Sequence, residues 1–233
     1  MARKPTRNSP TEAAAGKSAR ARMIDAFMAL LSEKQFERIG VGEIASRAEV
    51  PLADLRAEFA SPFAILAAQA KAIDRAVLAA ADDEMAEEPP RERLFDVLMR
   101  RLEALEPHKA AMRSLLHSAM RNPGLALALN GLAARSQQWM LAAAGISVAG
   151  PKGAARAQGL ALLLAPVLRT WVGDDDPGHA RTMAALDRAL ARGQRWSGLL
   201  DDLWSIPERV CRARPRRRRS ASGEDGATNS VGR

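Results

Sequence analysis

The sequence contains few of the residues from which β-sheets are built. Only 4% of its 233 residues are aromatic, and tyrosine is absent. Strands favour aromatic and β-branched residues, whereas much of the hydrophobic 47% of this chain is alanine and leucine. Alanine and leucine are the best helix formers. The composition therefore excludes a β-sandwich or barrel and predicts an all-α fold.

Cysteine and long hydrophobic runs are equally scarce. Cys211 is the single cysteine, which excludes a disulfide within the chain and is typical of a cytoplasmic protein. The nearest approach to a membrane span, residues 160–168, is too short for a bilayer and contains Pro166. The basic N-terminal residues are not followed by the apolar segment of a secretory signal. We therefore expect a cytoplasmic protein without stable membrane insertion.

Motifs of catalysis and metal binding are missing as well. His108, His117 and His179 lie far apart, and none has a second metal ligand at helical spacing. The sequence has no glycine-rich phosphate loop, no nucleophile elbow and no Cys/His cluster. The acidic run 174–176 directly precedes Pro177, and acidic residues stabilise the N-terminus of a helix. These absences predict a protein that is not an enzyme and that uses no metal or other cofactor.

Positive charge is concentrated at the two ends of the chain. The formal net charge is +8; residues 1–22 contribute +5 and residues 208–233 another +5, which leaves about −2 for residues 23–207. Basic segments suit phosphate backbones or anionic membranes, because long-range attraction needs no fixed geometry. Disordered tails that only aid solubility would have the same composition. Both interpretations of the chain ends stay open.

Apolar residues recur at helical spacing along most of the chain. Residues 24–31 place apolar side chains on one face of a helix, and short helices are expected at 42–48 and 52–59. Ser61-Pro62 is an N-cap followed by a first-turn proline, which predicts the start of a longer helix. Beyond Pro89-Pro90, further apolar stripes predict a helical bundle, for a total of roughly nine helices.

Residues 20–66 resemble the DNA-binding unit of TetR-family regulators. That unit has a helix, an aromatic turn, a helix containing Ile-Ala, a tight turn, a recognition helix ending in Phe, and the start of a fourth helix. The corresponding residues here are Arg22-Met23-Ile24-Asp25-Ala26-Phe27, Phe36-Glu37, Val41-Gly42-Glu43-Ile44-Ala45, Ala48-Glu49-Val50-Pro51, Leu55 to Phe59, and Ser61-Pro62. The spacing matches without a gap, and the apolar positions that pack the helices, Val41 among them, are filled.

The resemblance implies a plan for the whole chain. A helix-turn-helix DNA-binding unit would occupy residues 17–62, and a helical ligand-binding and dimerisation domain residues 63–207. Residues 1–16 would form a disordered basic arm able to enter an adjacent minor groove, and residues 208–233 a disordered Arg-rich tail. The implied function is that of a homodimeric regulator on double-stranded DNA, a repressor that a small apolar ligand releases.

Contacts with DNA are expected from the first helix and from the helix-turn-helix. The residues that the resemblance implies are Arg20, Arg22, Arg47, Leu52, Ala53, Asp54 and Arg56. The chain departs from the family pattern where Gly40 and Gly42 replace a capping Thr or Ser, and where Glu49 replaces the turn glycine. Asp54 and Glu58 would face or flank the phosphates, and their negative charge opposes DNA binding.

The helical body supplies two further sets of residues. An apolar ligand pocket between the middle helices is expected to be lined by Met112, Leu116, Leu129 and Trp139. Core packing would explain this first set equally well. A dimer interface of four helices is expected from Leu163, Val167, Trp171, Met183, Leu186 and Leu190.

A second resemblance supports an alternative without DNA. Residues 171–176 and 182–188 are similar to stretches of the TetR-like accessory proteins of ubiquinone biosynthesis, which bind lipid or quinone in their helical body. On this hypothesis the chain has lost DNA binding, and the basic tail serves a membrane. A third hypothesis is a partner-binding module that uses the same dimer surface.

Overall fold

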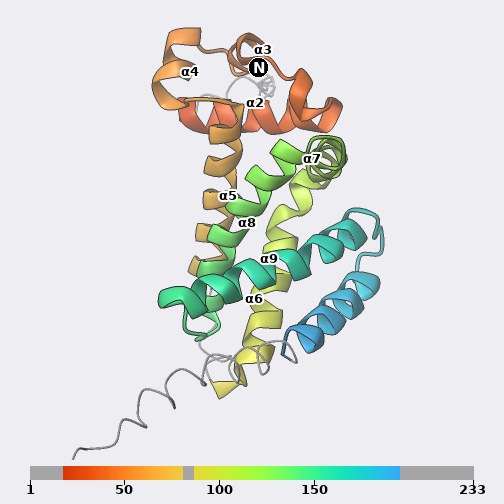
Figure 1. Cartoon of the computed structure of the whole chain (residues 1–233). Helices are drawn as coiled ribbons and strands as arrows, with labels where there is room; N and C mark the ends of the chain where they lie inside the picture. Colours follow the sequence, from red (N-terminus) through yellow and green to blue (C-terminus); the bar gives the residue numbers. More distant parts are fainter. Residues whose placement is uncertain (1–17, 81–86, 195–233) are drawn as a thin grey trace, which may run out of the picture. The chain divides into compact units, whose positions relative to one another are not determined.

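The computed structural model describes residues 18–80 and 87–194, and within these ranges it contains helices, turns and loops but no strand (Figure 1). The helices are α2 (Ala19–Glu33), η1 (Phe36–Arg38), α3 (Val41–Arg47), α4 (Leu52–Glu58), α5 (Pro62–Ala79), α6 (Pro90–Leu105), η3 (Glu106–His108), α7 (Lys109–Arg121), α8 (Pro123–Ala143) and α9 (Gly150–Val172). A last described helix covers 180–194. The all-α prediction is confirmed.

Several earlier expectations fall on residues that the structure does not describe. The expected arm at 1–16 and the expected Arg-rich tail at 208–233 lie outside the described ranges, as does the end of the expected helical domain at 195–207. The described residues all belong to one compact unit that ends at Gln194. No helix within them is both long and apolar enough to span a membrane.

Short polar side chains cap α2, α5 and α8, and the start of α5 at Ser61-Pro62 is the one predicted from the sequence. The hydroxyl of Ser61 accepts a hydrogen bond from the Ala64 amide (3.2 Å), and Pro62 occupies the first turn of α5. Ser18 caps α2 in the same way, and the Asn122 side chain accepts from the Leu125 amide (3.0 Å) at the start of α8. Each cap satisfies one of the free amide groups of a helix N-terminus.

The acidic run 174–176 also caps a helix. The carboxylate of Asp174 accepts hydrogen bonds from the amide (2.9 Å) and the hydroxyl (2.6 Å) of Thr182, and that of Asp176 accepts from the Ala180 amide (3.2 Å). The helix thus starts near residue 180, slightly later than the position of Pro177 suggests. The described ranges hold no cluster of His, Cys, Asp and Glu suited to a metal ion.

The N-terminal helices pack around a shared apolar cluster. Phe27, Leu31 and Ile44 are fully buried in it, and the rings of Phe27 and Phe36 meet edge to face at 6.2 Å. Val41 was expected to pack there but is 46% exposed, because it is the first residue of α3 and its side chain lies at the helix end. The cluster continues beyond residue 62 into α5, α7 and α8, so the helix-turn-helix is packed firmly on the body.

A second apolar cluster forms the core of the body. It joins α5, α6, α8, α9 and the helix at 180–194, and its most buried large side chains are Leu98, Met140, Trp171 and Leu186. Figure 1 shows α8 and α9 crossing each other, with the helix at 180–194 beside α9. The α5 helix contributes to both clusters and thereby connects the two parts of the core.

Candidate nucleic-acid interface and ligand cavity

The α3–α4 pair has the geometry of a helix-turn-helix. At the turn, the amide of Val50 donates to the Ala45 carbonyl (3.1 Å), and Glu49 adopts a left-handed backbone conformation with φ of 54°. Leu55 is 3% exposed and fixes α4 on the core. The opposite side of α4 is therefore directed away from the protein.

The outward side of α4 carries four of the residues expected to touch DNA. Leu52 is 53% exposed, and Ala53, Asp54 and Arg56 are exposed as well. Within the described part of the chain, Arg56 forms no ion pair, so its guanidinium is available to a phosphate or a base. DNA contact by these residues stays a prediction.

The arginines expected around α4 already have partners inside the protein. Arg20 forms an ion pair with Glu58 (2.8 Å) and lies 4.7 Å from the centre of the Phe59 ring, while Arg47 contacts Glu33 at 2.7 Å. Both pairs are about half exposed, and exposed ion pairs contribute little to stability. These two arginines can exchange their carboxylates for phosphates at small cost.

Arg22 has a different role from Arg20 and Arg47. Its side chain is half-buried, and Nε donates to the carbonyl of Ala48 (3.3 Å) at the end of α3. This contact ties α2 to the turn that positions α4. Arg22 therefore helps to hold the helix-turn-helix in place.

The helix-turn-helix has almost no net charge. Residues 18–62 carry six Lys and Arg against seven Asp and Glu. Phosphate contacts supply most of the affinity of proteins for DNA, and that affinity depends on Lys and Arg. If this unit binds DNA, it can offer shape and a few individual contacts, and long-range attraction to phosphates would have to come from the basic segments at the chain ends.

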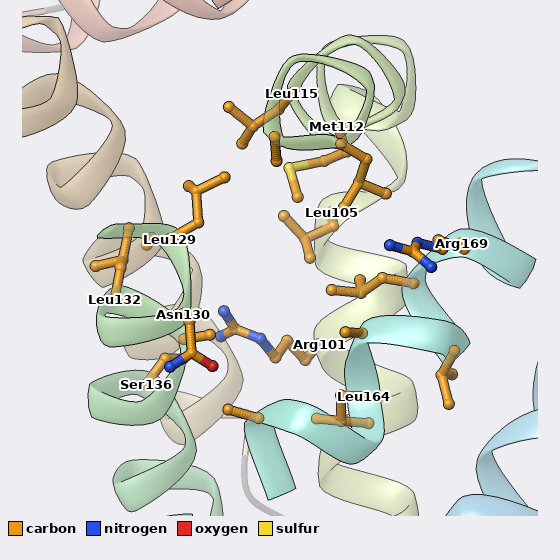
Figure 2. Close-up of a pocket in the computed structure, with 18 of the residues that line it drawn as sticks. Arg101, Leu105, Met112, Leu115, Leu129, Asn130, Leu132, Ser136, Leu164 and Arg169 are labelled. Carbon is orange, nitrogen blue, oxygen red and sulfur yellow. The ribbon is translucent and has the colours of Figure 1, made fainter. Parts of the chain in front are cut away.

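The body contains a cavity of about 290 Å³, at the lower end of the range for ligand pockets. Residues from α5 to α9 line it, together with Met28 of α2 (Figure 2). Met112, Leu116 and Leu129, which were expected at a ligand pocket, line this cavity, and ligand binding by them stays a prediction. Trp139 does not, because its side chain is on the outer side of α8 and is 59% exposed; that expectation is wrong.

Polar groups on one side of the cavity are bound to each other. Arg101 of α6 forms an ion pair with Asp74 of α5, and the hydroxyl of Ser136 donates to the same carboxylate (2.7 Å). Figure 2 shows Arg101 reaching from α6 toward the side of α8 that carries Asn130 and Ser136. Asp74 is 8% exposed, so this network is nearly dry. Its charges cancel within the protein.

These polar groups were not among the residues predicted from the sequence to line a pocket. A signal was present in α8, where the apolar spacing Leu129, Leu132, Met140 also puts Ser136 on the inner face. A polar residue on a buried face requires a partner, and here the partner is Asp74. The partner lies 62 residues away along the sequence, and spacing within one helix cannot identify it.

The α7 helix connects the cavity with the helix-turn-helix. One side of α7 lines the cavity through residues such as Met112 and Leu116. On its other side, the Ser114 hydroxyl donates to the Lys34 carbonyl (2.8 Å), and the Ser118 hydroxyl accepts from the Phe36 amide (3.1 Å). A shift of α7 at the cavity would therefore act on the segment between α2 and α3.

The residues expected at a dimer interface are mostly inside the protein. Exposure is 2% for Val167, 0% for Trp171, 0% for Leu186 and 5% for Leu190. These four side chains belong to the core of the body and cannot meet a second copy, so that expectation is wrong for them. These apolar residues do share one face of each helix, as their spacing predicts, but these faces are directed toward the interior of the chain.

The other two residues of the expected interface differ from each other. Leu163 is half-buried and faces Gly193 of the same chain, where an added Cβ would lie 2.9 Å from the leucine side chain. Met183 is 38% exposed on the helix at 180–194. On α9 the large exposed apolar side chain is Leu162, which is 59% exposed.

Three solved structures are similar to this chain over most of its length. A TetR transcriptional regulator from Rhodococcus sp. RHA1 is 24% identical, with a TM-score of 0.55 over 75% of this chain and 95% of that one. The TetR transcriptional regulator from Nitrosomonas europaea ATCC 19718 is 20% identical, with a TM-score of 0.60 over 76% and 99%. A tetR-family transcriptional regulator from Streptomyces coelicolor is 14% identical, with a TM-score of 0.52 over 85% and 90%.

The comparisons by sequence gave no match. No protein-family model matches the chain, and no curated protein does so at a significant level. At the identities of the solved structures, the similarity concerns the fold.

Proposed function

We propose that this chain, whose fold is that of the TetR-type transcriptional regulators, is a homodimeric DNA-binding regulator that a small apolar ligand releases from its operator. The observation that carries the proposal is the connection through α7: a helix-turn-helix with an outward α4 is hydrogen-bonded to a helix that lines an apolar cavity. We therefore expect this protein to act as a repressor.

Binding to DNA would begin with α4 in the major groove. Leu52, Ala53 and Asp54 lie in its first turn, where a recognition helix meets the base edges. Arg56 would contact a phosphate, and Arg20 and Arg47 would do so after leaving Glu58 and Glu33. Asp54 can accept a hydrogen bond from cytosine N4, which turns an unfavourable charge into a determinant of specificity.

Release would pass from the cavity to α4 through α7. A ligand that fills the cavity favours the arrangement of α7 that fits around it, and α7 is bonded to the segment between α2 and α3. A ligand shifts such an equilibrium by its difference in affinity for the two states. The state that binds the ligand would hold the two α4 helices of a dimer at the wrong spacing for DNA.

A dimer is required because an operator with two half-sites needs two recognition helices. We propose that the exposed sides of α9 and of the helix at 180–194 form the interface. These sides present Leu162 and Met183 among small residues such as Ala155, Gly159 and Ala184, which allow two helices to approach closely.

The test is binding of the purified full chain to its own upstream promoter fragment and to a scrambled duplex, titrated over salt concentration. Selective binding that survives removal of residues 208–233 supports the proposal. Arg56→Ala should weaken binding and reduce the salt slope by about one, since one phosphate contact is lost. Arg75→Ala removes an exposed arginine from α5, outside the helix-turn-helix, and should leave binding unchanged.

Two results would contradict the proposal. Binding without selectivity that disappears with residues 208–233 would mean that the helix-turn-helix has lost its operator, and the lipid- or quinone-binding alternative would then take its place. An unchanged affinity and salt slope in the Arg56→Ala variant would show that α4 does not lie against the phosphates.

A further inference from the structure

Some of the polar groups that line the cavity have hydrogen-bond partners within the protein, and others do not. The amides of Asn130 and Gln158 bond to each other in both directions (3.0 and 3.3 Å). Ser136 donates to Asp74, and Arg101 is paired with the same carboxylate. None of these groups requires a hydrogen bond from a ligand.

Gln137 of α8 is the exception among the buried groups of the cavity. Its side chain lines the cavity and is 3% exposed, and its Oε1 atom has no hydrogen-bond partner within the described part of the chain. A buried acceptor without a partner destabilises the folded protein, because it has lost its hydrogen bonds to water. Oε1 is covered in this conformation, so a molecule in the cavity would recover this cost by donating a hydrogen bond to Gln137 once its amide turns toward the cavity.

The charges of the cavity argue against a carboxylate as that molecule's polar group. Arg101 is already neutralised by Asp74, and a second carboxylate beside this pair would be buried without a counter-charge. Arg169 is the other charged side chain of the lining, and it is exposed to solvent. Water satisfies its guanidinium without a ligand.

We infer that the cavity binds an uncharged, mainly apolar molecule with one hydroxyl group, and that Gln137 orients this molecule. The inference rests on the proposed role of the cavity as a ligand site. A hydroxyl both donates and accepts, so it pairs with the amide whichever way the amide is turned. The remaining lining is dominated by Leu, Met and Ala side chains, which suit an aliphatic chain or a small ring.

The inference is tested with decanol and decanoate, two probes of equal chain length that differ in their polar group. Binding to the full chain without DNA is measured by calorimetry at neutral pH, where decanoate is ionised. We expect decanol to bind at least tenfold more tightly than decanoate.

A pair of variants isolates the amide of Gln137. Gln137→Met keeps the length of the side chain and removes the acceptor. We expect it to lower the affinity for decanol about tenfold, which corresponds to the loss of one buried hydrogen bond. Gln138→Met changes the exposed neighbour on the same helix and should have no effect. Without ligand, Gln137→Met should unfold at the same or a higher temperature than the wild type, because it removes an unpaired buried group.

Three outcomes would overturn the inference. Decanoate could bind as tightly as decanol, with the affinity lost in Arg169→Gln; the ligand would then be an anion held at Arg169. Decanol could bind equally well to Gln137→Met and to wild type, with Gln137→Leu giving the same answer if the first variant is unstable. Finally, neither probe could bind. The proposed regulator function is tested separately by the promoter titration, which uses neither probe, so its failure can be told apart from failure of this inference.

Discussion

At the scale of single residues, Glu49 is held in a conformation that its side chain disfavours. Its φ of 54° lies in the left-handed region, which costs a non-glycine residue about 1–2 kcal/mol, and its side chain is exposed. Glu49→Gly should therefore raise the free energy of unfolding by about 1 kcal/mol. Thermal or urea unfolding of the full chain measures this gain.

The control for Glu49 separates conformation from charge. Glu49→Ala removes the same carboxylate but keeps a Cβ, so it should not stabilise the protein. If alanine and glycine stabilise equally, the gain comes from the lost negative charge, and the turn is not strained as described.

Sequence reasoning was reliable at the residue scale where the cause is local. Ser61 and Asp176 cap helices because their side chains reach amide groups three and four residues away, and such spacings are visible in the sequence. Partners that are distant in sequence could not be predicted in this way. Arg20 pairs with Glu58, 38 residues further along the chain, and its contact with a phosphate stays a prediction.

At the scale of elements, α7 carries the proposed signal. Ser118 is 1% exposed, and its hydroxyl accepts from the Phe36 amide, which loses its partner in Ser118→Ala. We expect this variant to lose about 1–2 kcal/mol of stability. It should also reduce the factor by which saturating decanol raises the Kd for promoter DNA, since one of the bonds between α7 and the helix-turn-helix is gone.

A matched serine supplies the control for this coupling. Ser32 lies on α2, and its hydroxyl donates to Ala29 within the same helix (2.6 Å). Ser32→Ala should leave the effect of decanol on DNA binding intact. Equal loss of the effect in both variants, or in neither, would contradict a signal that passes through Ser118.

The start of the helix at 180–194 should make stability depend on pH. Hydrogen bonds from Thr182 lower the pKa of Asp174 below its usual value of 3.8. The charged carboxylate therefore stabilises the folded protein above that pH, and the contribution disappears as the pH falls through the lowered pKa. Asp174→Asn should lower the melting temperature at neutral pH, and its difference from wild type should shrink in acid.

Asp175 is the natural comparison for this pH dependence. It is exposed and adjacent, and Asp175→Asn should leave both the melting temperature and its pH dependence close to those of the wild type. A pH-independent difference between wild type and Asp174→Asn would show that the charge of this carboxylate is not what stabilises the helix start.

For the last two described helices, the sequence predicts apolar faces but not which face is buried in the chain's own core. Apolar spacing placed Val167 and Trp171 on one face of α9 and Leu186 and Leu190 on one face of the last helix, and all four are buried. However, α9 has apolar residues on two sides, with Leu162 outside and Leu164 lining the cavity. Spacing cannot tell which side faces the chain's own core, because that depends on α8 and α6, which are distant in sequence.

At the scale of the whole molecule, the proposed function depends on two copies acting together. Each copy supplies one α4 helix with little net charge around it, so a single copy would bind DNA weakly. The second half-site and the basic chain ends have to make up the affinity. Loss of the dimer should therefore reduce promoter binding far more than loss of any one contact on α4.

Leu162→Arg tests this dependence through the exposed side of α9. Leu162 is 59% exposed in the single chain, so an arginine there costs the fold little, whereas at the proposed interface it would bring two positive charges together. Sedimentation should show a monomer, and promoter affinity should fall at least a hundredfold. Leu127→Arg, at a side chain that is 73% exposed on α8, should stay dimeric and bind normally. A Leu162→Arg dimer with wild-type DNA affinity would place the interface elsewhere on the body.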